Sequence, residues 1–249
     1  LRVYSGSAWQ DAAISATGVV TLTGTQTLTN KTLTAPVINS PSGNFLKIEG
    51  TNFTNSLLVG HATTGTLSSA EKNTGVGIGA LDAVTSGVGN TASGYEAGTD
   101  ITSGDDNTFT GKQAGTNVSS GNQNTGIGSN TLYSGNVSNC TAVGKNAIFG
   151  LTGSNNTAVG TAALKGVTNA AGHSNTALGE GSGEAMSTGT YNLCLGRSAG
   201  DNITSGDGNI IIGGIDADSA TADKQLIIAD GVDGSVAWIK GSSAGVVTL

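Results

Sequence analysis

The sequence has little of what a conventional globular core is built from. Aromatic residues make up 4 % of its 249 residues, charged residues 11 %, and there are only two prolines. A chain so rich in Gly, Ser, Thr and Asn would be disordered if these residues were scattered without period. Basic residues are scarce too, and the formal charge of −7 argues against nucleic acid or an anionic membrane as a partner. No apolar run approaches the roughly 18 residues of a membrane-spanning helix, so we expect no membrane insertion.

Cysteine and histidine are also rare, which limits redox and catalytic chemistry. Cys140 and Cys194 lie three sequence repeats apart. If each repeat adds one strand at about 4.8 Å, they are separated by about 14 Å, beyond the reach of a disulfide. We therefore expect buried free thiols. His61 and His173 lie in unlike contexts, and no Ser/His/Asp or Cys/His constellation is recognisable. We predict neither enzymatic activity nor a cofactor.

What the sequence does contain is a five-residue unit that ends in glycine and occurs nine times. The final glycines are 17, 17, 17, 16, 16, 19, 17 and 17 residues apart. A short fixed period of this kind is typical of a stack of small identical units. The copies are Asn73–Gly77, Asn90–Gly94, Asn107–Gly111, Asn124–Gly128, Cys140–Gly144, Asn156–Gly160, Asn175–Gly179, Asn192–Gly196 and Asn209–Gly213.

The columns of the repeat predict β-structure. Counting the first residue of each copy as position 0, position +1 is mostly Thr, +3 mostly aliphatic, +2 mostly Gly or Ala, and +4 always Gly. In a strand, +1 and +3 face one way and +2 and +4 the other. A second small column, seven residues after position 0, suggests strand, turn, short strand and turn in each repeat. We predict an all-β parallel β-roll or β-solenoid with about nine repeats of ~17 residues.

The face formed by +2 and +4 is nearly bare and lets another backbone approach closely. A unit with so little apolar mass cannot fold alone, and its bare face favours partners side by side. We therefore predict several identical chains wound round one axis with the small columns facing inward, most simply a homotrimer.

Four segments follow from the position of the repeats. Residues 1–42 are predicted to form an N-terminal β-hairpin, turning at Gly6, and a Thr-rich extended linker. Residues 43–72 are predicted to form entry cap strands, 73–213 the repeat β-roll, and 214–249 a C-terminal β cap. Within this last segment we expect Trp238 to cover the open end of the stack.

Close carboxylate pairs and Asp-containing turns are the most reactive features. Paired acids can hydrolyse polysaccharides, but these pairs occupy different repeat columns, so solvated loop carboxylates explain them better. The turns at 103–107 and 205–209 have oxygen ligands suited to Ca²⁺, yet ordinary Asp-Gly turn chemistry is the simpler explanation. The pairs are Asp105/Asp106, Glu180/Glu184 and Asp216/Asp218.

Two further columns could contact a ligand. We expect the Asn residues at position 0 to hydrogen-bond up and down the stack or close turns, with a sugar-binding ladder as the alternative. Aromatic side chains beside the strand glycines and in the return loops could stack on sugars or fill packing gaps. These are Tyr95, Tyr133, Phe149 and Tyr191. The receptor-binding residues stay unknown.

Three stretches resemble structural proteins of tailed bacteriophages. Residues 25–38, Thr-Gln-Thr-Leu-Thr-Asn-Lys-Thr-Leu-Thr-Ala-Pro-Val-Ile, resemble a linker motif of phage tail fibres, and residues 2–10 are similar to segments of marine phage structural proteins. The Asn-Thr-Ala-Val-Gly repeats over 73–213 resemble arrays in phage tail-fibre proteins. They are also similar to the head repeats of trimeric autotransporter adhesins, although Thr here usually replaces the first aliphatic residue of that consensus.

The resemblance implies a structural protein of the virion, a tail fibre or tail appendage that mediates or spaces host-cell attachment. It further implies a homotrimer, contact with other tail or baseplate proteins through the N-terminal part, and a host surface glycan or receptor as target. Similar fibres often end in a self-cleaving chaperone domain, which this sequence does not contain. The alternative is a bacterial surface adhesin of the trimeric autotransporter type. A glycan-degrading enzyme has the weakest support.

Overall fold

The computed structural model describes residues 2–4, 9–11, 46–48, 50–60 and 64–248, and the chain divides into two compact units, Leu1–Asn39 and Ser40–Leu249. In the first unit, strands β1 (Arg2–Tyr4) and β2 (Trp9–Asp11) pair antiparallel, as a hairpin requires. The predicted turn at Gly6 and the predicted Thr-rich linker lie outside the described residues.

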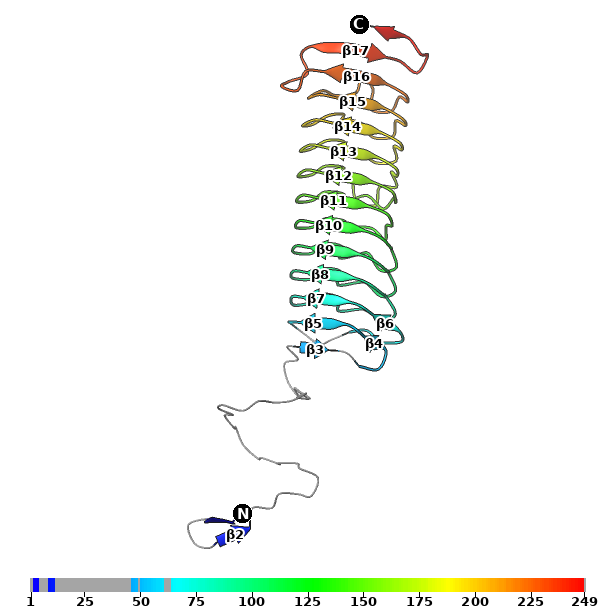
Figure 1. Ribbon diagram of the computed structural model, residues 1–249. Helices are drawn as coiled ribbons and strands as arrows, with labels where there is room; N and C mark the ends of the chain where they lie inside the picture. Colours follow the sequence, from blue (N-terminus) through cyan, green and yellow to red (C-terminus); the bar gives the residue numbers. More distant parts are fainter. Residues whose placement is uncertain (1, 5–8, 12–45, 49, 61–63, 249) are drawn as a thin grey trace. The chain divides into compact units, whose positions relative to one another are not determined.

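The second unit is a β-solenoid of about ten turns, most of them about 17 residues long. Each turn contributes one short strand, and neighbouring strands pair parallel and in register, so equivalent residues lie directly above one another (Figure 1). The predicted all-β parallel solenoid is confirmed. Its parallel strands after the entry segment are β7 (Thr74–Val76), β8 (Thr91–Ser93), β9 (Thr108–Thr110), β10 (Thr125–Ile127), β11 (Thr141–Val143), β12 (Thr157–Val159), β13 (Thr176–Leu178), β14 (Leu193–Leu195), β15 (Ile210–Ile212) and β16 (Leu226–Ala229).

Antiparallel strands close both ends of the parallel stack. At the entry, β3 (Leu46–Ile48) runs antiparallel to β5 (Leu57–Val59), which pairs parallel with β7, while β4 (Phe53–Thr54) and β6 (Ala70–Glu71) form a small parallel pair. Atypical terminal strands of this kind shield the ends of a solenoid.

At the exit, the chain reverses twice. Strand β17 (Ala237–Gly241) pairs antiparallel with β16, and β18 (Val247–Thr248) pairs antiparallel with β17. The strand that carries Trp238 therefore covers the end of the stack, but the Trp238 side chain is itself 57 % exposed. A bulge between Ile228 and Ala229 shifts the β16–β17 register at this point, and the covering of the open end by the Trp238 ring stays a prediction.

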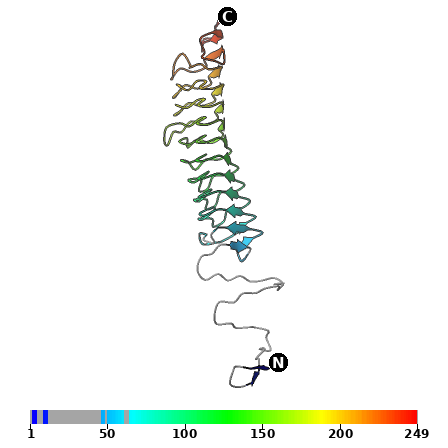
Figure 2. The ribbon, with the colours of Figure 1, turned by 90° about the vertical axis from the view of Figure 1, so that its left-hand side faces the viewer.

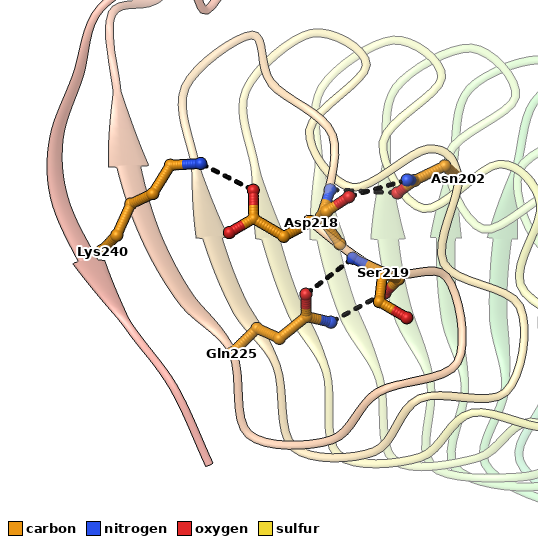
Figure 3. A network of polar contacts seen from close by, with 6 residues as sticks. Asn202, Asp218, Ser219, Gln225 and Lys240 are labelled. Atoms are coloured by element: carbon orange, nitrogen blue, oxygen red, sulfur yellow. Dashed lines mark hydrogen bonds and ion pairs between the residues drawn. The ribbon is translucent and has the colours of Figure 1, made fainter. Parts of the chain in front are cut away.

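Polar contacts hold the loop between β15 and β16 in place, as Figure 3 shows. Asn202 forms two hydrogen bonds with the backbone of Ala217, and the Gln225 side chain forms two with the backbone of Ser219. The Lys240 ammonium contacts Asp218 Oδ1 at 2.6 Å and so joins β17 to this loop (Figure 3). The final turn thus keeps its shape without the sequence of the regular repeat.

The strands place position +2 inside the solenoid and positions +1 and +3 outside. The burial of β7 to β9 alternates exposed, buried, exposed, and the later strands keep the buried central residue. The interior of one chain therefore contains the small column, and the chain's own return segments cover it. This corrects the argument for a homotrimer with small columns facing a common axis, because the bare face needs no second chain.

The glycines at position +4 allow close approach between successive turns. Gly128 has φ +131°, and a Cβ added there would lie 2.8 Å from the carbonyl carbon of Gly144 one turn later. A side chain would therefore clash with backbone that cannot move without breaking the stack. The backbone that approaches the bare face is the next turn of the same chain.

The return segments form turns in place of the second short strand that the repeat predicted. The small column that includes Ala80, Ala97 and Ala114 is buried, but it lies where the backbone changes direction. The next residue has a positive φ, for example 57° at Leu81 and 50° at Leu132. Large buried side chains of this segment, among them Leu81, Leu132 and Ile101, fill the interior.

Residue size is balanced between the strand and the return segment of one turn. Phe109 occupies a position +2 that is usually Gly or Ala, and a Cβ added to Gly115, six residues later, would overlap its ring. In the next turn the small residue is Gly126 at position +2 and the large one is the buried Leu132. A Cβ added to Gly126 would first meet Thr131 Oγ1 at 2.9 Å and Phe109 Cδ1 at 3.0 Å. Close packing thus depends on the column six residues away and on the neighbouring turn.

The Asn column at position 0 forms the predicted hydrogen-bond ladder inside the stack. In a typical turn, Asn107 Nδ2 donates to Asn90 Oδ1 at 3.0 Å and to Gly121 O at 2.8 Å. Its Oδ1 accepts from the backbone N–H of Asn124 at 3.0 Å and from Asn124 Nδ2 at 2.9 Å. The ladder begins at Ser56, whose hydroxyl accepts from Asn73 N, and ends at Gln225. Each buried amide therefore satisfies backbone groups that water cannot reach.

Candidate functional site: the outer strand face

The carboxylates paired in the sequence do not face each other as catalytic pairs. Glu184 forms an ion pair with Lys165 at 2.9 Å, whereas Glu180 lies 3.5 Å from Arg197. Asp105 Oδ1 accepts the backbone N–H of Val88 at 2.7 Å. Each of these acids thus contacts a neighbouring turn, which favours the structural interpretation of the pairs. The sequence partners Asp106 and Asp216 are both exposed.

The Asp-containing turns that were considered for Ca²⁺ link neighbouring turns of the solenoid. Asp207 Oδ1 accepts from the backbone N–H and the hydroxyl of Thr190, the first at 2.6 Å. Within the described part of the chain, no group of three or more His, Cys, Asp or Glu side chains could hold a metal ion. That part also contains no helix with the length and apolar character that crossing a bilayer requires.

Burial rules out the Asn column as a sugar-binding ladder. The amide-bearing members of the column are at most 2 % exposed, so a glycan has no access to them. The aromatic candidates are scattered: Tyr95 and Tyr191 are 48 % and 68 % exposed, while the half-buried rings of Tyr133 and Phe149 stack on each other at 4.9 Å. They therefore do not form one platform for a sugar.

The remaining candidates are packed against the chain itself. His173 meets the ring of Tyr191 edge to face at 5.7 Å, and His61 lies outside the described residues. Cys140 and Cys194 are free and buried, as predicted. Burial raises the pKa of the Cys140 thiol to about 11 and that of Cys194 to about 12, which makes both unreactive at neutral pH.

Two acidic features were missed in the sequence. Burial, followed by a hydrogen bond with Asp216, raises the pKa of Asp201 to about 6. Hydrogen bonds from backbone N–H groups, that of Val236 first, lower the pKa of Asp230 to about 2. An Asp-Gly turn at 230–231 indicates the second feature, but no sequence signal brings Asp201 and Asp216 together, because they occupy different columns of the repeat, nine residues after Asn192 and seven residues after Asn209.

The most extended exposed feature is the outer strand face, which we define as positions +1 and +3 of β7 to β16. Figure 2 shows the strands of the second unit along one side of the stack and the return loops on the other, so this face of the sheet is uncovered. It contains only Thr, Ser, Val, Ile and Leu, although the chain has 27 charged residues counting 10 basic and 17 acidic. The face is therefore an uncharged strip on an acidic protein.

The outer strand face changes character along the stack. Position +1 is Thr from β7 to β13 and then Leu or Ile from β14 to β16. Ile239 lies directly across from Ile228 in the antiparallel pair and so shares its face. The result is an aliphatic patch of eight side chains on β13 to β17: Leu178, Leu193, Leu195, Ile210, Ile212, Leu226, Ile228 and Ile239.

The aliphatic patch is accessible. Leu178, Leu195 and Ile210 are 49 %, 37 % and 40 % exposed, and the other five side chains are half-buried. Contiguous apolar surface of this kind typically marks an interaction site in a soluble protein.

Comparison with protein families, curated proteins and solved structures gives no match to this chain.

Proposed function

We propose that the chain is a structural component of a phage tail, a tail fibre or related appendage, that mediates or spaces attachment to the host cell. The observation that carries the proposal is the in-register stack of repeats with its buried Asn ladder. About ten turns at about 4.8 Å each give a rod of roughly 48 Å. Such a rod separates its two ends without needing a large core, which suits a spacer or a fibre segment.

The sequence resemblances favour a phage tail over other rod-like proteins. The Thr-rich segment 25–38 resembles a tail-fibre linker, and the repeats resemble tail-fibre arrays. On this proposal the N-terminal part contacts other tail or baseplate proteins, and the fibre belongs to the surface of the virion, where its target is a host glycan or receptor. We also propose that the working form is a homotrimer, in line with the same resemblance.

The alternative function is that of a bacterial surface adhesin of the trimeric autotransporter type. It is favoured by one observation, the similarity of the Asn-Thr-Ala-Val-Gly repeats to the head repeats of those adhesins. Both functions use a rigid rod at a surface, so they differ chiefly in the particle that carries the chain.

The proposal is tested by determining whether phage particles or bacterial outer membranes carry the chain. Peptides from residues 73–213 should be found by mass spectrometry in DNA-filled particles purified on a density gradient. Antibodies raised against the same region should label the tails of those particles, and capsid-specific antibodies serve as the matched control. Peptides found in bacterial outer-membrane fractions and absent from the particles would contradict the phage assignment and support the adhesin.

A further inference from the structure

We propose that the outer strand face, and its aliphatic patch above all, is the surface on which copies of this chain associate side by side and in the same direction. The inference rests on the proposed homotrimer and specifies its contact. It assigns the contact between copies to the outer face of the strands, because the small columns on the other face are buried inside each chain.

The outer strand face differs from the rest of the acidic chain because it carries no charged residue. The chain carries a formal charge of −7, so most surfaces of two copies repel each other at low ionic strength. The outer strand face has no charged residue at either position from β7 to β16. It is therefore a surface on which acidic chains can approach without placing like charges opposite one another. The same absence of charge gives anionic lipid or nucleic acid nothing to bind.

The chemistry of the patch fits a second apolar sheet better than a glycan. A sugar site needs a few placed polar groups and aromatic faces, whereas the patch offers eight Leu and Ile side chains. Strands β17 and β18 extend the same sheet and carry further exposed apolar side chains, Trp238 at 57 % and Val247 at 55 %. Apolar surface thus accumulates toward the C-terminal end.

The available area is sufficient for an association. From β7 to β17 the face is about 48 Å long at about 4.8 Å per strand. A strip about 10 Å wide, three residues at about 3.3 Å each, then offers roughly 480 Å² per copy. Three copies that bury this strip together remove roughly 1,400 Å² in all, about 480 Å² for each copy, so the whole assembly exceeds the roughly 1,000 Å² expected of a specific interface.

The gradient along the face determines the direction of association. In a parallel arrangement the aliphatic patch of one copy meets the patches of the others, and the Thr-rich part meets its equivalent. An antiparallel pair would place Leu195 and Ile210 of one copy against the Thr- and Ser-bearing strands of the other. Because apolar surface is best buried against apolar surface, the parallel arrangement is favoured, and it is compatible with a three-fold axis.

The experiment measures the solution mass of the full chain by light scattering at several concentrations. The test variant is L195K/I210K, which places two cations in the patch at positions exposed in the single chain. The matched control is Ile78→Lys, because Ile78 is 65 % exposed but lies beyond the strand, outside the outer face. Circular dichroism and thermal melting establish that each variant is folded.

We expect the wild-type chain and Ile78→Lys to have a mass near three times 24.3 kDa and L195K/I210K to fall to 24.3 kDa while still folded. A patch variant with the wild-type mass would overturn the face assignment and leave the trimer intact. A monomeric wild-type chain would overturn both, while the phage assignment would still be decided by the particle analysis.

A second measurement keeps the inference testable if the double variant does not fold. Leu195→Cys should be linked between copies by a bismaleimide with a spacer of about 10 Å, because packed sheets lie about 10 Å apart, beyond the reach of a direct disulfide. Equivalent residues face each other in this way only in a parallel assembly on this face. Ile78→Cys is the control, and the two buried native thiols make the wild-type chain a suitable blank. Equal cross-linking of both variants, or none in either, would overturn the proposed contact.

Discussion

The inner and outer faces of the same three-residue strands follow different constraints. On the inner face, residue size changes from turn to turn and is balanced locally, as in the exchange between Phe109 with Gly115 and Gly126 with Leu132. On the outer face, Thr recurs at position +1 in seven consecutive turns, whichever residue lies beneath it. The packing of the inner face is thus balanced turn by turn, whereas the outer face stays uncharged throughout and changes at position +1 only once, from Thr to Leu or Ile after β13.

This difference separates stability from interaction. The inner face contains the buried ladder and the buried hydrophobic residues, so substitutions there should change the free energy of unfolding. The exposed residues of the outer face touch little of their own chain, so substitutions there should leave folding almost unchanged and affect association. Each prediction below substitutes matched positions with different surroundings.

The largest effect is expected at Phe109. Phe109→Ala should lower the free energy of unfolding by about 3–5 kcal/mol, because a fully buried ring is replaced by a cavity. The adjacent Thr108→Ala, on the outer face, should change it by no more than about 0.5 kcal/mol. Urea unfolding monitored by circular dichroism measures both. Similar losses for the two variants would contradict the assignment of inner and outer faces.

A compensating substitution sharpens this prediction. The F109A/G115L variant recreates the small and large pair seen at Ala158 and Leu164, and Leu164 tolerates a φ of 46° where Gly115 has 67°. It should recover about half of the loss, because contacting residues couple by roughly 0.5–3 kcal/mol. Strictly additive effects in this double-mutant cycle would show that the two columns do not balance each other.

The Asn ladder should give the next largest effect. Asn107→Ala removes four side-chain hydrogen bonds and leaves buried groups such as Gly121 O without a partner. We expect a loss of about 3 kcal/mol, since each unsatisfied buried group costs roughly 1–3 kcal/mol. The control is Asn122→Ala: its Oδ1 also accepts a backbone N–H, from Asp105, but in an exposed position that water can occupy. That loss should stay below about 1 kcal/mol.

The fold was predictable from the sequence where the signal is local. The strand at each repeat follows from the Thr-x-aliphatic-Gly pattern, and the ladder follows from an amide recurring once per turn. The alternation of residue types does not predict which strand face is inside. Positions +1 and +3, with Thr and aliphatic residues, are more apolar than the Gly and Ala of positions +2 and +4, yet they lie outside. The deciding residues, such as Leu81 and Ile101, lie in return turns that carry no strand period.

The candidate site was predictable in its residues and not in its role. The replacement of Thr by Leu193, Ile210 and Leu226 at position +1 is visible in the sequence. Its meaning depends on knowing that these side chains point outward, which the burial of Cys194 and Ile211 between them establishes. The Asp201 and Asp216 contact was beyond sequence reasoning, because it joins residues from different columns of two successive return segments.

The single interruption of the ladder provides a smaller, stabilising test. At Cys140 the thiol accepts the Asn156 N–H at 3.5 Å and lies 3.8 Å from Gly153 O, both weak contacts. Cys140→Asn should place an amide within reach of both groups and raise the free energy of unfolding by about 0.5–1 kcal/mol. Cys194→Asn, on the inner face at position +2, should instead lower it by about 1–3 kcal/mol, because the buried amide has no ladder to join. The same sign for both variants would contradict the distinction between the two columns.

The smallest effect is expected at Asp201, and it depends on pH. Its pKa in the folded chain is about 6, above the ordinary 3.8, because burial and Asp216 disfavour the charged form. Its contribution to stability is therefore fully present below pH 4 and is lost as the pH rises from about 4 to 6. Solvent screens this partly exposed carboxyl, so we expect a loss of only about 0.5–1 kcal/mol.

Asp201→Asn should remove this pH dependence, because the amide remains neutral and can still donate a hydrogen bond to Asp216. At pH 7 the variant should be more stable than the wild-type chain by about 0.5–1 kcal/mol, and near pH 4 the two should be alike. Asp106→Asn, at an exposed carboxyl in another turn, is the control, and its difference from wild type should not vary in the same way. Urea unfolding at pH 4, 5, 6 and 7 gives both differences. A difference in the free energy of unfolding between Asp201→Asn and the wild-type chain that stays constant across this pH range would mean that the two carboxyls do not share a proton.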